Sequence, residues 1–240
     1  MRKIFLLIFF SVSFLLIENF LSNNSKIDSA IFTYFVVDPA KDEIRFFLKN
    51  RNGDFYKTFE NLSNELKNKN QTLAFATNGG MFMKNFLPLG LYIENGKTIT
   101  KINKKHGNTN FYIEPNGIFY VTYKNKAAIV KTKDFISSNK IKYATQSGPM
   151  LLIDGNINPQ FKKHSINLNI RSGVGILQDG KILFAITNIP MNFFDFTSFF
   201  RDRECTNALF LDGGISEFYF PEKGITKNYQ QFSVIIGVTK

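Results

Sequence analysis

The chain has 240 residues, and 30 lysines and arginines against 19 aspartates and glutamates leave a formal net charge of +11 at neutral pH. Its cations are mostly lysines scattered through loops, densest at 104–105, 131–133 and 162–163. No basic helix face with interleaved aromatic residues forms, which argues against nucleic acid as a partner. The charge instead favours attraction to anionic envelope polymers or lipid surfaces. The single cysteine, Cys205, excludes an internal disulfide.

The N-terminus begins Met-Arg-Lys and continues as an apolar run from Ile4 to Ile17, a pattern typical of a secretory signal. This run is shorter than the roughly 20 apolar residues of a spanning helix. We therefore expect 1–22 to be a signal peptide or an N-terminal anchor, with a membrane as partner only through this segment. The protein is then exported: periplasmic, secreted or anchored at the outer face of the inner membrane. The rest, 30–240, has the length of one domain.

Short β-rich runs recur along this domain, separated by turn signals. Asn-Gly and Asp-Gly pairs at 95–96, 116–117, 154–155 and 179–180 predict tight hairpins and hence antiparallel pairing. The expected strands are Ile31–Val37, Ile44–Leu48, Leu73–Thr77, Leu91–Glu94, Ile118–Tyr123, Met150–Ile153, Lys181–Thr187, Ala208–Leu211 and Phe232–Val238.

Helical spacing of apolar residues predicts two helices, at Thr58–Asn68 and Met191–Glu204, and more weakly a third at Thr132–Asn139. No linker or repeat divides the chain. The predicted fold class is α+β: a single domain with a mixed, largely antiparallel β-sheet core and a few packed helices.

Four polar or glycine-rich segments interrupt the apolar strands. In the first, Asn78 follows the strand that begins at Leu73, and Gly79 and Gly80 let backbone amides approach a ligand closely. In the second, Ser147 and Gly148 precede a strand. A plain turn is the alternative interpretation of the first segment.

The third segment runs from Arg171 through Ser172 to Ile176, and the fourth from Leu211 to Glu217. Arg171 enters a strand of small and apolar residues, where an unpaired guanidinium is costly. It either pairs with a buried carboxylate or holds a phosphate or carboxylate of a ligand. Asp212 is directed from a strand end into an open loop, although an Asp that only caps a turn is equally compatible with this position.

Together, in this order, the segments resemble the phosphodiester glycosidase family. The residues that carry the resemblance are Asn78-Gly79-Gly80-x-Phe82, Ser147-Gly148-Pro149 with Asp154-Gly155, Arg171-Ser172-Gly173-Val174-Gly175, and Leu211-Asp212-Gly213-Gly214-x-Ser216. His106-Gly107-Asn108 and Phe111–Gly117 are similar to a small bacterial exported branch of that family. The chain departs from the family pattern at two positions, where Ile215 replaces a glycine and Glu217 a hydroxyl residue.

The resemblance implies hydrolysis of a bond between the anomeric carbon of a sugar and a phosphodiester oxygen. Phosphate leaves as a stable anion, so it needs electrostatic stabilisation more than a proton. Arg171 and the amides of Asn78–Gly80 are then expected to hold the phosphate. Asp212 serves as base toward water or as nucleophile, with Glu217 as reserve carboxylate. The other expected substrate-binding residues are Ser147, Gly148, Ser172, Gly213, Gly214, Ser216 and His106.

The expected partner is a glycan or sugar phosphate, and the sequence predicts no cofactor and no metal. His106 has a second interpretation, as a solvated histidine in a lysine-rich loop. The alternative function is a non-catalytic envelope protein that binds a glycan or an anionic polymer through the same cleft.

Overall fold

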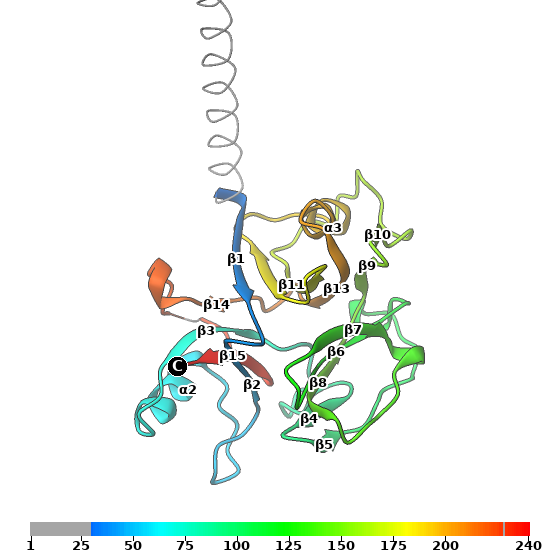
Figure 1. Ribbon diagram of the computed structural model, residues 1–240. Helices are drawn as coiled ribbons and strands as arrows, with labels where there is room; N and C mark the ends of the chain where they lie inside the picture. Colours follow the sequence, from blue (N-terminus) through cyan, green and yellow to red (C-terminus); the bar gives the residue numbers. More distant parts are fainter. Residues whose placement is uncertain (1–29, 228) are drawn as a thin grey trace, which may run out of the picture.

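The computed structural model describes residues 30–227 and 229–240, so the expected signal peptide or anchor at 1–22 lies outside the described residues. The described residues form one domain with three β-sheets and two α-helices (Figure 1). Every strand pair within them is antiparallel. The largely antiparallel core is confirmed, whereas the mixed character expected of the sheet is wrong.

The first sheet has six strands, in the order β1-β12-β11-β13-β9-β10. They are β1 Phe32–Val37, β12 Ile182–Thr187, β11 Ser172–Leu177, β13 Cys205–Asp212, β9 Met150–Ile153 and β10 Asn156–Ile157. The second sheet has four strands, β14 Phe218–Tyr219, β3 Leu73–Asn78, β15 Ile235–Thr239 and β2 Glu43–Phe47. The third has five, β5 Lys97–Thr100, β4 Tyr92–Glu94, β8 Ile141–Ser147, β6 Gly117–Thr122 and β7 Ala127–Lys131.

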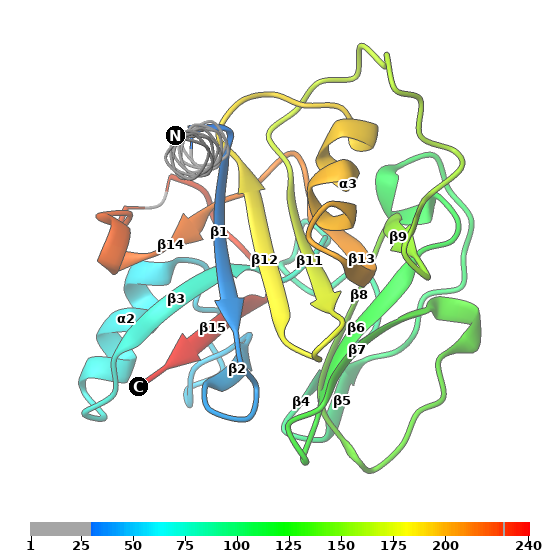
Figure 2. The same ribbon diagram turned by 45° about the horizontal axis from the view of Figure 1, so that its top comes forward.

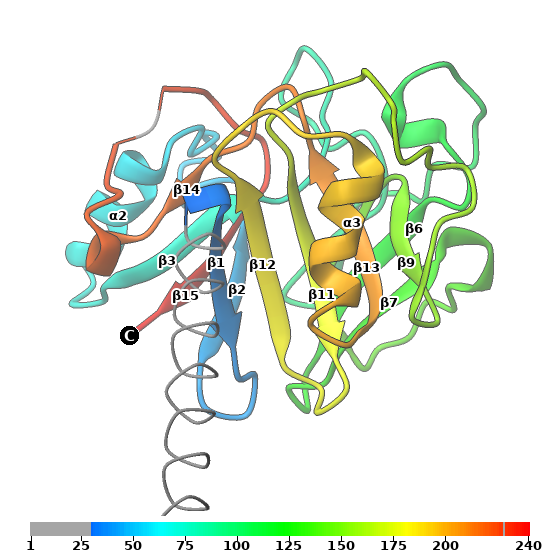
Figure 3. The ribbon, with the colours of Figure 1, turned by 90° about the horizontal axis from the view of Figure 1, so that it is seen from above.

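The two predicted helices are confirmed and begin where a polar side chain caps them. Helix α2, Phe59–Lys67, starts after Thr58, whose side chain accepts a hydrogen bond from the Asn61 amide. Helix α3, Phe193–Arg201, starts after Asn192 in the same way. Figure 3 shows α3 lying across β11 and β13 of the first sheet, whereas α2 lies beside β3. No helix of the described residues is long and apolar enough to cross a membrane.

The helix expected at Thr132–Asn139 is wrong. Only a 3-10 turn, Thr132–Asp134, forms there. Thr132 is buried, and its backbone amide donates a hydrogen bond to the Asn116 carbonyl oxygen. The residues after 135 are exposed. A helix without an apolar face to bury gains no tertiary packing.

Three of the four predicted hairpin turns are confirmed, at 95–96, 154–155 and 179–180. The fourth is wrong, because Gly117 is already the first residue of β6, and the buried Asn116 donates a hydrogen bond to the Phe111 carbonyl oxygen. The Asn-Gly pair favours a tight turn with positive φ, but burial of Asn116 prevents that turn here.

The three sheets meet in an aromatic core. Phe184 of the first sheet lies 5.5 Å from Phe75 of the second and 6.1 Å from Phe119 of the third, measured between ring centroids. Each of these fully buried rings contributes roughly 1.5–3 kcal/mol through burial alone. Because this core fixes the sheets to one another, loops from different sheets are held in a constant arrangement at their shared edge. Figure 2 shows the strands of the first sheet side by side above the other two sheets.

Candidate active site

Asp212 is the last residue of β13, and its carboxylate is enclosed by the loop that follows. Its Oδ1 accepts hydrogen bonds from the amides of Gly213 at 2.6 Å, Gly214 at 2.8 Å and Ile215 at 3.4 Å. Burial raises the pKa of Asp212 above its ordinary value, and the three amide bonds offset this only in part. A carboxyl group whose pKa is raised by burial is a better proton acceptor than an ordinary aspartate.

Three of the four predicted segments converge beside this carboxylate through a chain of hydroxyl groups. Ser216 donates to the Asp212 carbonyl oxygen at 2.5 Å, and its Oγ lies 3.0 Å from that of Ser172. Ser172 in turn lies 3.2 Å from the Asn78 side-chain oxygen. Residues 78 and 172, which belong to different sheets, are thus brought together by the fold. Asn78 Nδ2 is buried and has no hydrogen-bond partner among the described residues.

The glycine loop after Asn78 contributes one free amide. The Gly79 amide donates to the Val234 carbonyl oxygen at 2.8 Å, so it is not available to a ligand. Gly80 has a φ of +126°, and within residues 30–227 and 229–240 its amide has no partner. Of the donors expected to hold a phosphate in this loop, the Gly80 amide and Asn78 Nδ2 are therefore available.

The remaining segment, the second, lies against the same cluster. Ser147 ends β8 and donates a hydrogen bond to the Leu211 carbonyl oxygen at 3.1 Å, directly before Asp212. Gly148 is required for space, because a Cβ there would lie 2.6 Å from the Phe111 carbonyl oxygen. These two residues support the wall of the site, and the Ser147 hydroxyl is engaged by the protein itself.

Arg171 precedes Ser172, and its side chain is fully buried. Its Nε donates to the Met191 carbonyl oxygen at 2.6 Å, its Nη2 to the Asn167 carbonyl oxygen at 2.8 Å, and the guanidinium lies 3.8 Å over the Phe193 ring. Burial lowers its pKa to about 10, so it is charged at neutral pH. No carboxylate pairs with Arg171 in the described part of the chain, so the interpretation as half of a buried ion pair is wrong. Its Nη1 has no hydrogen-bond partner there.

The side chains of Arg171, Glu217 and His106 have no contact with this cluster among the described residues. The Glu217 carboxylate accepts hydrogen bonds from the amides of Tyr229 at 2.9 Å and Gln230 at 3.4 Å. His106 is largely exposed, and its Nδ1 lies 3.6 Å from the Glu114 carboxylate. Asp212 is therefore the acidic residue that the hydroxyl network reaches, through its backbone carbonyl oxygen.

Sequence reasoning missed two threonines that support the site. Thr145 donates to the Gly79 carbonyl oxygen at 2.6 Å, and Thr187 accepts from the Arg171 amide at 3.0 Å. Both are buried and lie close to the end of a strand, where a polar residue in an apolar run is a signal that could have been used. Among the described residues no group of three or more His, Cys, Asp or Glu side chains could hold a metal ion.

The fold and the site define an antiparallel β protein with one partly buried carboxylate where strands of neighbouring sheets end. The chain belongs to the phosphodiester glycosidase family, whose model matches residues 71–234. It is 34% identical over 207 residues to the uncharacterized protein YigE of Escherichia coli strain K12, covering 86% of this chain and 81% of that protein. The family supports a hydrolase of the phosphodiester glycosidase type.

Solved structures share the fold, among them one from zebrafish and one from Synechocystis. One is the catalytic domain of zebrafish N-acetylglucosamine-1-phosphodiester α-N-acetylglucosaminidase, auto-inhibited by its pro-peptide, with a TM-score of 0.60, 16% identity, and coverage of 87% of this chain and 83% of that one. The other is a protein from Synechocystis, with a TM-score of 0.55, 14% identity, and coverage of 87% and 59%. At these identities the likeness establishes the fold alone.

Proposed function

We propose that the protein hydrolyses a glycosyl phosphodiester, releasing the sugar, and that Asp212 is the base that activates water. The observation that carries this is the Asp212 carboxyl itself. It is partly buried and its pKa is raised, and the hydroxyl network joins the backbone carbonyl of the same residue to Asn78. A carboxyl group serving only as a turn cap in solvent would have no burial to raise its pKa.

In the proposed reaction, water forms a bond to the anomeric carbon as the bond from that carbon to the phosphate oxygen breaks. Asp212 Oδ2 takes the proton from water, because Oδ1 is occupied by three backbone amides. The phosphate leaves as an anion with the bonding electron pair and needs no proton.

The departing anion is received by donors that the protein itself leaves unsatisfied. Asn78 Nδ2, Arg171 Nη1 and the Gly80 amide each have no partner among the described residues. A buried donor without a partner costs about 1–3 kcal/mol, and a ligand oxygen would recover that energy. Arg171 is covered by the segment around Asn167, so reaching its Nη1 requires this segment to move.

The direct test is release of sugar from an α-linked sugar 1-phosphodiester by the purified protein, compared with Asp212→Asn and Arg171→Ala. Equal rates for all three proteins would remove both assignments. The anomeric configuration of the first product, read by proton NMR, tests the role of Asp212. Inversion supports a base acting on water, whereas retention indicates a glycosyl-enzyme and makes Asp212 the nucleophile.

The proposal also includes export, which rests on the N-terminal sequence Met-Arg-Lys and the apolar run after it. Expression of the full chain with a C-terminal tag, followed by fractionation and mass determination of the mature N-terminus, tests it. A cytoplasmic protein that retains Met1 would contradict export.

A further inference from the structure

A pocket of about 570 Å³ lies outside the Asp212 cluster, where β6 begins and β7 ends. Four lysines that the sequence places in two separate dense spots line it together. They are Lys104, Lys105, Lys131 and Lys133. Folding therefore concentrates in one hollow a positive charge that is spread along the chain.

This charge is not balanced by the protein. Within the described part of the chain none of the four lysines forms an ion pair. The carboxylate in the pocket wall, Glu114, contacts His106 Nδ1 at 3.6 Å and none of the four lysines. Like charges placed together are unfavourable unless an anion joins them, and ammonium groups bind phosphate or carboxylate oxygens through charge-assisted hydrogen bonds.

The wall behind the lysines is firmly built. Gln146, which is buried, accepts from the Asn103 amide at 2.9 Å and donates to the Asn103 carbonyl oxygen at 2.7 Å. Asn158, also buried, donates to the Met150 carbonyl oxygen at 2.9 Å. The amide side chains of Gln146 and Asn158 are thus engaged in hydrogen bonds with the backbone. The lysine ammonium groups are the cationic groups that a ligand in the pocket can contact.

The pocket and the Asp212 cluster lie on either side of one strand end. Gln146 supports the pocket, and its neighbour Ser147 bonds to Leu211 beside Asp212. Across the third sheet, Ser147 pairs with Gly117 and Gly117 pairs with Lys131. Two strand spacings amount to about 10 Å between the backbones at Ser147 and Lys131, so the pocket and the cluster belong to neighbouring parts of the molecule.

We infer that this lysine pocket is a second anion-binding subsite, which takes a phosphate or carboxylate group borne by the substrate beyond the bond that is cleaved. The inference rests on the proposed function and narrows its substrate to a glycan with at least two anionic groups. The ammonium groups draw the charged chain into place, and the Asp212 cluster acts on the phosphodiester.

The first experiment measures binding independently of hydrolysis, with inorganic tripolyphosphate as the probe in titration calorimetry at low salt. The pocket variant carries glutamine at the four pocket lysines. A control variant loses the same charge at four exposed lysines outside the pocket. The control positions are Lys97, Lys124, Lys126 and Lys140.

We expect the pocket variant to bind tripolyphosphate at least tenfold more weakly than the wild type, and the control variant to change less than twofold. Thermal unfolding of both variants verifies that they are folded. Equal affinity of the two variants would overturn the subsite, because net charge alone would then explain the binding.

The second experiment compares two substrates, a phosphodiester with one small uncharged group and an oligomer of repeated glycosyl phosphate units. The pocket variant should raise KM about tenfold for the oligomer alone and leave kcat unchanged. A loss of tripolyphosphate binding with no change in KM would overturn the assignment to the substrate and leave a site for a separate anion. If the wild type cleaves neither substrate, the proposed function fails, and the calorimetry still decides the pocket.

Discussion

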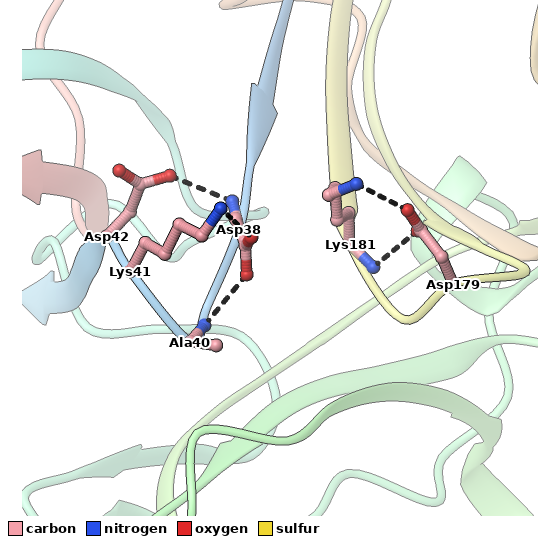
Figure 4. A network of polar contacts seen from close by, with 6 residues as sticks. All are labelled: Asp38, Ala40, Lys41, Asp42, Asp179 and Lys181. Atoms are coloured by element: carbon pink, nitrogen blue, oxygen red, sulfur yellow. Dashed lines mark hydrogen bonds and ion pairs between the residues drawn. The ribbon is translucent and has the colours of Figure 1, made fainter.

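The two ends of the six-stranded sheet carry the same residue types in opposite states. At one end, the turn that follows β1 contains Asp38, and the turn between β11 and β12 contains Asp179 (Figure 4). Asp38 accepts from the Ala40 amide at 3.0 Å and faces Lys41, and Asp179 is bonded to both the amide and the ammonium group of Lys181. Asp179 is exposed and Asp38 is half-buried, and both carboxylates are satisfied by their own turns.

At the opposite end, Asp212 also accepts bonds from the turn that follows it, but no cation is near it in the described chain. The pKa of Asp179 is lowered by its hydrogen bonds with Lys181, and that of Asp212 is raised by burial. An Asp-Gly sequence alone does not distinguish the two. Burial and the absence of a countercharge make one a structural turn and the other a candidate for acid-base chemistry.

The largest expected effect tests this contrast on activity. Asp212→Asn should lower kcat/KM by about 100- to 10,000-fold, because a positioned base is lost. Asp179→Asn, the matched change at the opposite end, should alter it less than twofold. In the wild type, kcat/KM should rise with pH through a midpoint above 3.8, the ordinary pKa of an Asp, because the active form is the carboxylate. Comparable losses in both variants would remove the distinction between the two ends.

The second prediction concerns two arginines at opposite ends of α3: Arg171 lies over its first residue, Phe193, and Arg201 is its last residue. Arg171 at the site end is buried, with two bonds to backbone carbonyls, whereas Arg201 is exposed and pairs with Asp202. Arg171→Ala should lower the free energy of unfolding by about 3 kcal/mol, through a cavity and two unpaired carbonyls. Arg201→Ala should change it by less than about 0.5 kcal/mol. Urea unfolding followed by circular dichroism measures both.

The variant Arg171→Met sharpens the result, since it keeps apolar volume against Phe193 and removes the charge. If this variant is at least as stable as the wild type, the guanidinium is kept for a ligand rather than for the fold. A loss as large as that of the alanine variant would make Arg171 a structural residue.

The third prediction separates two reasons why a position requires glycine, lack of space for a Cβ and a positive φ. Gly79 at the site end has no room, because a Cβ would lie 2.4 Å from Val234 Cγ1. Gly180 at the turn end has open space but a φ of +83°. Gly79→Ala should cost about 2 kcal/mol, and adding Val234→Ala should recover part of that cost. Gly180→Asn should be nearly neutral, because asparagine tolerates positive φ.

Thermal unfolding of the single and double variants measures these costs. If Val234→Ala gives no recovery, the close approach at Gly79 is not what requires a glycine.

The fold was predictable where local signals were strong. The nine expected strands and two of the three expected helices formed, because apolar periodicity and caps agree with burial. Strand β8 was missed, although it ends in Ser147, since its buried polar residues interrupt the apolar alternation. Sequence cannot show that Gln146 is buried by the loop at Asn103, which lies 43 residues away.

The site was predictable as a set of segments but not as a geometry. Asn78 and Ser172 are 94 residues apart, and only the packing of two sheets makes them neighbours. Glu217 was expected as a reserve carboxylate because it follows Ser216 in sequence. Neighbouring side chains in an extended segment point to opposite sides, and Glu217 accordingly contacts Tyr229 while Ser216 contacts Asp212.

The smallest expected effect is on stability and has the opposite sign at the two ends. Asparagine mimics a neutral acid, so Asp212→Asn should stabilise the fold at pH 7 by about 1 kcal/mol, as changes at functional sites often do. Because the folded-state pKa of Asp212 is raised, the wild type loses stability as pH rises from 3.8 through that pKa. The gain of the variant should therefore vanish below pH 3.8.

Asp179 has a lowered pKa, so Asp179→Asn should lose a small stabilisation that the wild type has only above its folded-state pKa. Urea unfolding at pH 3 and at pH 7 decides between these outcomes, and a destabilised Asp212→Asn at pH 7 would show that the three amide bonds outweigh the cost of burying the charge.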